Sequence, residues 1–220
     1  MQPSLEQLAI TYKNLPADKL IRLAVTDAAG LRPEALELLK AEIKGRGLDD
    51  GILRGIDVQL NHVDDSQLNN YLALVRNQAC PTCGDQSQQL NAVLSTTVIS
   101  AIIFTHYKKA FSIGCPTCLK KANQKATLKT ALLGWWGLPW GLMRTPQALI
   151  SNTKTNKRIN TGEPTPILVD FIKNNIGIIE SIKNNDQSLQ VMLTNLNNKQ
   201  HYNKYHIIKH GANRHPIPSR

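Results

Sequence analysis

Four cysteines are the residues of this chain whose type and spacing could do chemistry. They form two copies of one tetrapeptide, Cys80-Pro81-Thr82-Cys83 and Cys115-Pro116-Thr117-Cys118. Two residues between paired thiols let both sulfurs of a tight turn face one ion, and Gly84 suits the positive-φ position that often closes such a turn. Four thiolates around one ion form a closed structural zinc site. The pattern therefore predicts one structural zinc ion bound by Cys80, Cys83, Cys115 and Cys118.

Other interpretations of the cysteine pairs fit less well. Iron can occupy a four-sulfur site, and the sequence leaves the choice between zinc and iron open. A thioredoxin-like redox pair needs one such motif in a βαβ setting, whereas here two motifs flank a β-rich insert. A closed site leaves no position for water or substrate, and no nucleophile–base pair, Gly-rich phosphate loop or carboxylate pair stands out. We therefore expect a non-enzymatic protein, and we identify no small-molecule substrate.

The segment between the cysteine pairs is rich in β-branched residues, which favours strands over a helix. We expect a strand over residues 93–105, a turn near His106–Lys109 and a return strand at Ala110–Ile113. With a cysteine pair at each end, this hairpin would be a zinc ribbon. A membrane span needs roughly 20 mostly apolar residues, and the glutamines and hydroxyl residues in this run argue against one.

The first 79 residues show the apolar periodicity of helices. Their pattern runs from Leu15-Pro16-Ala17-Asp18-Lys19-Leu20 through Leu31-Arg32-Pro33-Glu34-Ala35 to Arg46-Gly47-Leu48. It resembles a short helical unit found in uncharacterised bacterial proteins. The resemblance covers about forty residues, as Leu15 to Leu48 with its flanks. It implies a helical pair and no activity.

A basic helix is expected from Leu119 to about Leu133, and a tryptophan segment follows it. The helix carries Lys120, Lys121, Lys125 and Lys129, and the segment holds Trp135, Trp136 and Trp140. Tryptophan favours the lipid headgroup layer, where its N–H stays hydrated, and flanking lysines attract anionic lipids. These seven residues predict an interfacial or shallow re-entrant membrane contact. The alternative is a tryptophan core where the ribbon packs on the C-terminal helices.

Residues 80–152 resemble a group of uncharacterised bacterial zinc-ribbon proteins. The resemblance rests on Cys-x-x-Cys-Gly, a β-rich insert, a second Cys-x-x-Cys and the run Gly134-Trp135-Trp136-Gly137. It implies that the four cysteines bind zinc and that Gly134–Gly137 lies at a membrane. Pro139 and the sparse apolar residues after Met143 depart from a full membrane span. The resemblance implies no reaction.

The basic character of the chain belongs to its second and third parts. Net charge is +10, of which residues 1–79 carry −2 and residues 80–150 and 151–220 carry +6 each. Such charge suits nucleic acid or an anionic membrane surface as a partner. The first residues lack the basic stretch and apolar run of a signal peptide, and we expect an intracellular protein.

These features predict an α+β fold with a small β-hairpin zinc ribbon and an amphipathic, interfacial helix. The expected regions are 1–79, helical; 80–150, zinc ribbon and tryptophan segment; 151–165, polar linker; and 166–220, short helices at 166–175 and 177–185 and a polar tail. His201, His206, His210 and His215 in that tail are interpreted as chance clustering.

The expected function is that of a scaffold or regulator at the cytoplasmic face of a membrane, acting with a protein partner that the sequence does not name. The alternative is a nucleic-acid-binding zinc ribbon. The expected hairpin argues against this alternative because it is apolar over most of its length. Lys108 and Lys109 are its only cations.

Overall fold

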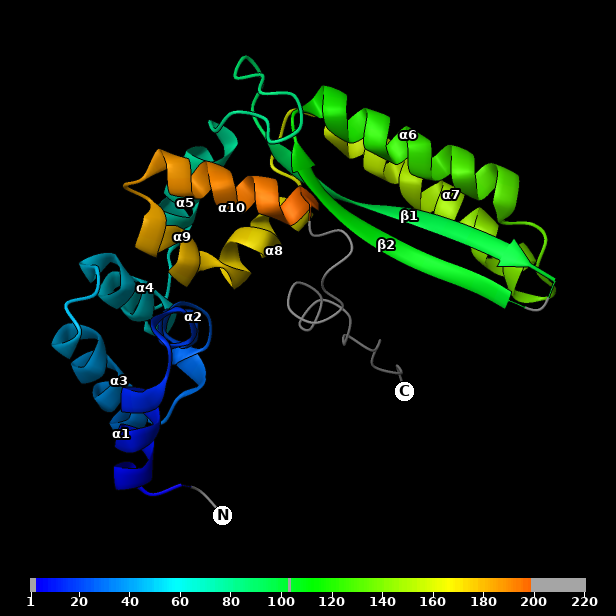
Figure 1. The fold of residues 1–220 in the computed structure, drawn as a ribbon. Coiled ribbons are helices and arrows are strands. Elements are labelled where there is room, and N and C mark those ends of the chain that lie inside the picture. Colours follow the sequence, from blue (N-terminus) through cyan, green and yellow to red (C-terminus); the bar gives the residue numbers. More distant parts are fainter. Residues whose placement is uncertain (1–2, 103, 199–220) are drawn as a thin grey trace, which may run out of the picture. The chain divides into compact units, whose positions relative to one another are not determined.

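The computed structural model describes residues 3–102 and 104–198, and the four tail histidines lie outside these ranges. The chain forms two compact units, one of Met1–Val75 with Asn175–Leu189 and one of Arg76–Asn174 with the residues from Gln190 onward. Figure 1 shows helices flanking one antiparallel hairpin, which confirms the expected α+β fold. The C-terminal helices are divided between the two units.

The first unit is helical, as expected. Its elements are α1 (Leu5–Asn14), α2 (Ala17–Thr26), the 3₁₀ turn η1 (Ala28–Gly30), α3 (Pro33–Gly45), α4 (Asp50–Leu60), most of α5 (Asp65–Arg76) and α9 (Ile176–Ile182). Ser4 and Gln7 form a capping box at α1, which satisfies two backbone amides of its first turn. Pro33 stands in the first turn of α3, where its missing N–H costs nothing. Gly47 (φ +61°) ends that helix, as the sequence predicts.

Apolar side chains on α2, α3 and α4 form the core of the first unit. Leu20, Leu39, Ile43 and Ile56 are fully buried there. α4 packs closely on α9. The glycine at position 55 permits this approach, because a Cβ there would meet the backbone carbonyl of Gly177. The sequence predicted these helices individually but not the joining of α9 to this core.

The second unit is built on the hairpin of β1 (Asn91–Ala101) and β2 (Phe104–Gly114). Its helices are α6 (Pro116–Leu133), α7 (Trp140–Ile159), α8 (Pro166–Asn174) and the C-terminal part of α10 (Asp186–Asn198). The strands pair in register from Asn91↔Gly114 to Ala101↔Phe104. The turn expected near His106–Lys109 is therefore wrong. Those residues lie within β2 with exposed side chains, and the chain reverses direction between the end of β1 at Ala101 and the start of β2 at Phe104, with Ile102 in the turn.

Polar side chains cap the free edge of β1, where a third strand would otherwise pair. Asn152 of α7 accepts a hydrogen bond from the Thr96 amide (2.9 Å) and donates one to the Thr96 carbonyl (2.8 Å). Thr130 of α6 accepts a hydrogen bond from the Val98 amide (3.1 Å). Because unpaired strand edges invite other chains, these buried contacts close the edge and fix α6 and α7 beside the hairpin (Figure 1).

The free edge of β2 is capped in the same way near its end. Asn197 of α10 accepts a hydrogen bond from the Ile113 amide (3.0 Å) and donates one to the Ile113 carbonyl (2.7 Å). One asparagine thus replaces one residue of a neighbouring strand at each edge. The helix α10 was not expected, although Leu189, Leu193 and Leu196 recur at helical spacing and the first two are fully buried.

The polar linker expected over residues 151–165 is wrong for residues 151–159, which continue α7. Asn and Thr have weak helical preference, but their side chains here make contacts that the composition does not show. Asn152 is fully buried against β1, and the Thr153 hydroxyl donates to the Leu149 carbonyl (2.9 Å). Tertiary contacts therefore override the local preference. α8 and α9 occupy the ranges expected for the two short helices.

Candidate metal centre

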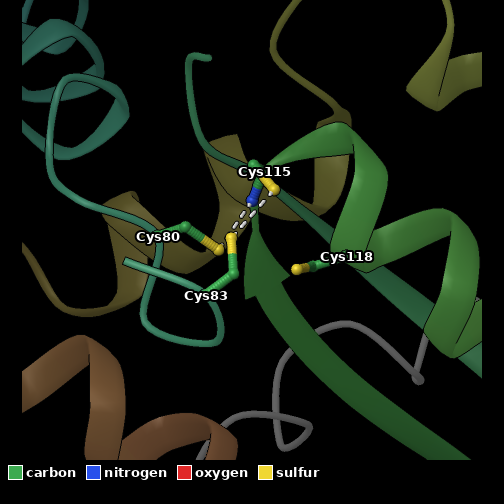
Figure 2. Close-up of side chains that lie close together, drawn as sticks. All are labelled: Cys80, Cys83, Cys115 and Cys118. Carbon is green, nitrogen blue, oxygen red and sulfur yellow. Dashed lines mark hydrogen bonds between the residues drawn. The ribbon is translucent and has the colours of Figure 1, made fainter. Parts of the chain in front are cut away.

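The hairpin register brings the two cysteine pairs to one end of the second unit. Cys80 and Cys83 lie in the loop between α5 and β1, and Cys115 directly follows β2. Cys118 lies in the first turn of α6. Figure 2 shows the four side chains close together, drawn from these three segments. Pairing of Asn91 with Gly114 places the start of β1 beside the end of β2, which positions the site.

The four sulfurs are spaced as ligands of one ion. All four Sγ atoms lie within 4.8 Å of one another, and the Cys83 and Cys115 sulfurs are 3.7 Å apart. Zinc–sulfur bonds of about 2.3 Å in a tetrahedron place the sulfurs about 3.8 Å apart. No disulfide joins these cysteines. The arrangement therefore fits a single metal ion held by four sulfurs, which confirms the predicted grouping of the ligands.

The two identical tetrapeptides adopt different local structures. Cys80–Cys83 forms a turn, in which the Gly84 amide donates to the Cys80 carbonyl (2.8 Å) and Gly84 has the predicted positive φ of +76°. Cys115 is instead the N-cap of α6, with Pro116 as the first helical residue. The second pair is thus the start of a helix and not a second tight turn. A helix N-terminus favours nearby negative charge, which suits thiolate ligands.

Hydrogen bonds and burial give the thiols of the cluster different acidities. Burial alone would raise the pKa of Cys80, but backbone amides, including that of Cys115 at 3.3 Å from the Cys80 sulfur, lower the pKa to about 7. Burial raises the pKa of Cys115 and Cys118. Cys80 is therefore the first of these three to become a thiolate.

The cluster has a buried half and an accessible half. Cys80 and Cys115 are each 1% exposed, whereas Cys83 is exposed and Cys118 is partly exposed. Gly114 allows the close approach, because a Cβ there would lie 3.4 Å from the Cys80 sulfur. With four sulfurs around one ion the coordination is complete, so this arrangement suits a structural role.

The tryptophan segment lies at the opposite end of the hairpin and is exposed. Trp135, Trp136 and Trp140 are 42%, 69% and 56% exposed, so the alternative of a tryptophan core is wrong. The Leu138 amide donates to the Ile102 carbonyl (3.3 Å), which joins the α6–α7 connection to the hairpin turn.

Two indole N–H groups of this segment are hydrogen-bonded within the protein. Trp135 Nε1 donates to the Ala131 carbonyl (2.9 Å), and Trp136 Nε1 donates to the Leu132 carbonyl (3.0 Å). These carbonyls lie in the last turn of α6, where helix carbonyls lack backbone partners. The indole N–H groups were expected to face water, but each donates to a carbonyl at the end of α6 while its ring stays exposed.

Further exposed apolar residues surround the tryptophans. Together with Trp135, Trp136 and Trp140 we call the following residues the apolar tip: Ile102, Phe104, Leu128, Leu132, Leu133, Leu138, Leu142 and Met143. Ile102 and Phe104 were not predicted as members of this surface, because the hairpin turn was expected at residues 106–109. Gly137 allows the connection between α6 and α7 to lie close to the hairpin, because a Cβ there would come within 2.8 Å of Ser100 and Thr105.

Cations flank the apolar tip without acidic neighbours in sequence. Residues 86–162 contain no Asp or Glu and ten cations, which are Lys108, Lys109, Lys120, Lys121, Lys125, Lys129, Arg144, Lys154, Lys157 and Arg158. Of the four predicted contact lysines, Lys121, Lys125 and Lys129 are exposed and Lys120 is partly exposed. Lys125 shares one face of α6 with the exposed Leu128 and Leu132, so charge continues directly into the tip.

Comparison with protein-family models, curated proteins and solved structures finds no match for this chain. The resemblance to bacterial zinc-ribbon proteins therefore stays a prediction. Within residues 3–102 and 104–198, no helix combines the length and the apolar character needed to cross a bilayer.

Proposed function

We propose that this chain is a non-enzymatic, zinc-stapled protein that binds the surface of an anionic membrane through its apolar tip. In this proposal zinc holds the open end of the hairpin, and the tip enters the headgroup layer at the other end. The role is that of a scaffold or regulator at the cytoplasmic face. The observation that carries the proposal is the exposure of three tryptophans beside cation-rich helices.

The hydrogen bonds of the indoles support entry into an apolar medium. A polar group buried without a partner costs several kcal/mol in hydrocarbon. The indole N–H groups of Trp135 and Trp136 already donate to backbone carbonyls. Their rings can therefore move from water into lipid without losing a hydrogen bond. Tryptophan is enriched at membrane interfaces. These two rings are therefore suited to contact lipid.

The hairpin turn supports the same conclusion. Two-residue turns favour Asn and Gly, because these residues tolerate positive φ. Here Ile102 has φ +36° and is 80% exposed, although β-branched residues disfavour this conformation. Neither local preference nor aqueous solvation favours isoleucine at this position. An apolar partner does, and strained backbone is often found at functional sites.

The position of the cations indicates which lipids the tip meets. Lys129 and Arg144 lie within one or two helical turns of the exposed Leu132 and Met143. Each cation near an anionic membrane surface contributes roughly 1 kcal/mol. Lys120 and Lys121 lie near the other end of α6, about 12–14 Å beyond Lys129 along the helix axis. Screening over a Debye length of about 10 Å makes their contribution small when the tip points into the membrane.

Zinc fits the open end of the hairpin as a structural staple. Val93, Leu119 and Ile159 form one buried apolar cluster of the second unit. Other buried residues of this unit are polar, among them Thr96 and Asn152. A structural metal site adds its binding free energy to the stability of the folded state. Thiolate ligands in a tetrahedral set suit zinc, with iron as the alternative.

A nucleic-acid-binding function is the second candidate. It is favoured by the ten cations of residues 86–162, because phosphate contacts provide most of the affinity for DNA and RNA. Exposed aromatic rings also stack on single-stranded bases. Strong binding to RNA or DNA that falls steeply with salt, together with no binding to vesicles, would favour this candidate.

Vesicle binding by charge variants tests the membrane proposal and its orientation. The double variant Lys129→Gln/Arg144→Gln removes two cations near the tip, whereas Lys120→Gln/Lys121→Gln removes two cations near the metal centre. At roughly 1 kcal/mol per cation, the first should weaken binding to phosphatidylserine vesicles about thirtyfold and the second much less. The measurement is co-sedimentation with anionic and neutral vesicles. Equal losses from both variants on both vesicle types would contradict the proposal.

A further inference from the structure

A small cavity lies on the free edge of β1, apart from both the cysteine cluster and the apolar tip. Its volume is about 170 Å³, and residues of β1, β2, α7 and the start of α8 line it. Its lining residues include Leu94 of β1, Lys109 of β2 and Arg158 of α7. The cavity is unrelated to the metal site and has no role in the proposed membrane contact.

The backbone of Leu94 is a gap between two capped positions on this edge. Thr165 donates to the Ala92 carbonyl (2.5 Å), and Asn152 pairs with both backbone groups of Thr96. Backbone groups that face one edge of a strand recur every second residue. The Leu94 amide and carbonyl therefore face the same edge, and within the described residues no hydrogen bond reaches them. Buried or half-buried backbone groups normally have partners, so this position is suited to a ligand.

The walls of the cavity are positively charged. Lys109 and Arg158 form no ion pair with the acidic residues of the described chain, and no Asp or Glu lines the cavity. The Ser151 hydroxyl also lines it. The lining thus offers one guanidinium, one ammonium, the hydroxyls of Ser151 and three threonines, and the Leu94 backbone amide, and these donors match the acceptors of an oxyanion.

We propose that this cavity binds the phosphate group of a small soluble molecule. Arg158, Lys109 and the Leu94 amide would donate to phosphate oxygens, and the Leu94 carbonyl would accept from a P–OH or a neighbouring hydroxyl. A lipid headgroup is a less suitable source, because Arg158 lies eighteen residues along α7 from Trp140, or about 27 Å. A tip seated in a membrane leaves the cavity beyond the reach of that membrane's phosphates.

Titration of the full chain with inorganic phosphate tests this site. In ¹⁵N-resolved NMR spectra, the Leu94 amide signal should shift and saturate. Arg158→Gln should weaken phosphate binding about tenfold, as expected for loss of a charge-assisted pair. The matched control is Lys157→Gln, which removes the same charge from the neighbouring exposed position, outside the cavity lining, and should change affinity less than about twofold.

Sulfate and lipid provide the discriminating comparisons. Sulfate carries no O–H group at neutral pH, whereas phosphate does. If the Leu94 carbonyl accepts a hydrogen bond from the ligand, sulfate should therefore bind more weakly than phosphate. Equal weakening by Arg158→Gln and Lys157→Gln, or an unchanged Leu94 signal at millimolar phosphate, would overturn the site. A Leu94 shift induced by phosphatidic acid vesicles but not by phosphate would overturn the soluble source. Because these titrations use no membrane in their main arm, their failure leaves the membrane proposal unaffected.

Discussion

The four cysteines show how one short motif can serve two local structures around one site. Cys80 and Cys83 sit in a turn closed by Gly84, whereas Cys115 and Cys118 begin α6. The spacing of two residues brings the thiols of each pair together in both cases. The sequence was therefore sufficient to predict the ligand set, because this spacing works in a tight turn and in a first helical turn alike.

Loss of one ligand tests the metal centre. We expect about one zinc ion per molecule in the purified chain, as the four-sulfur set implies. Cys115→Ser should release the metal and lower the melting temperature, because metal binding is coupled to folding and Cys115 is buried. Elemental analysis and thermal unfolding are the measurements. A wild-type chain that is fully folded and metal-free would disprove the site.

The acidity of Cys80 gives metal binding a pH signature. With a pKa of about 7, Cys80 is a thiolate above that pH and carries a proton below it. Zinc displaces this proton on binding, so affinity should fall as pH decreases, with about one additional tenfold loss per pH unit below pH 7. Competition with a chelating dye on both sides of pH 7 measures this slope. A slope that stays constant across pH 7 would rule out the assigned acidity.

At the scale of elements, Asn152 shows why the polar linker prediction failed. Its side-chain amide pairs with the Thr96 backbone as a residue of a neighbouring strand would. Its backbone carbonyl accepts a hydrogen bond from the side-chain amide of Asn123 (2.7 Å). Composition indicates where Asn and Thr accumulate but not which of them are buried. The hairpin, apart from its turn, and the helical character of residues 1–79 could be predicted, because their residue preferences and apolar spacing are local. The edge contacts join residues more than thirty positions apart, so they could not be predicted.

Removal of the Asn152 side chain should destabilise the second unit. Asn152→Ala leaves the Thr96 amide buried without a partner and leaves the Thr96 carbonyl with only the long hydrogen bond from Thr130 (3.4 Å), which costs about 1–3 kcal/mol. The neighbouring variant Thr153→Ala removes an exposed hydroxyl and should change stability by less than about 0.5 kcal/mol. Chemical denaturation measures both. If the two variants were equally stable, the edge contact would not hold α7 on the hairpin.

At the scale of the whole chain, the second unit carries a sulfur cluster at one end of its hairpin and an exposed apolar surface at the other end. The sulfur cluster lies where β1 begins and β2 ends, and the apolar tip lies where the strands reverse. The sequence predicted the tryptophans as contact residues but not Ile102 and Phe104. An isoleucine at position 102 of the turn contradicts ordinary turn preferences, so only the observed register reveals this position. The exposure of Ile102 supports the proposed membrane contact of the tip.

The most direct test of the membrane proposal is the fluorescence of the tip. The chain has three tryptophans, all at the tip, so its tryptophan emission reports on this region alone. Addition of anionic vesicles to the zinc-loaded protein should shift the emission to shorter wavelength. Quenchers on lipid acyl chains should gain access, and water-soluble quenchers should lose it. Emission and quencher access that do not change at saturating anionic lipid would contradict the account.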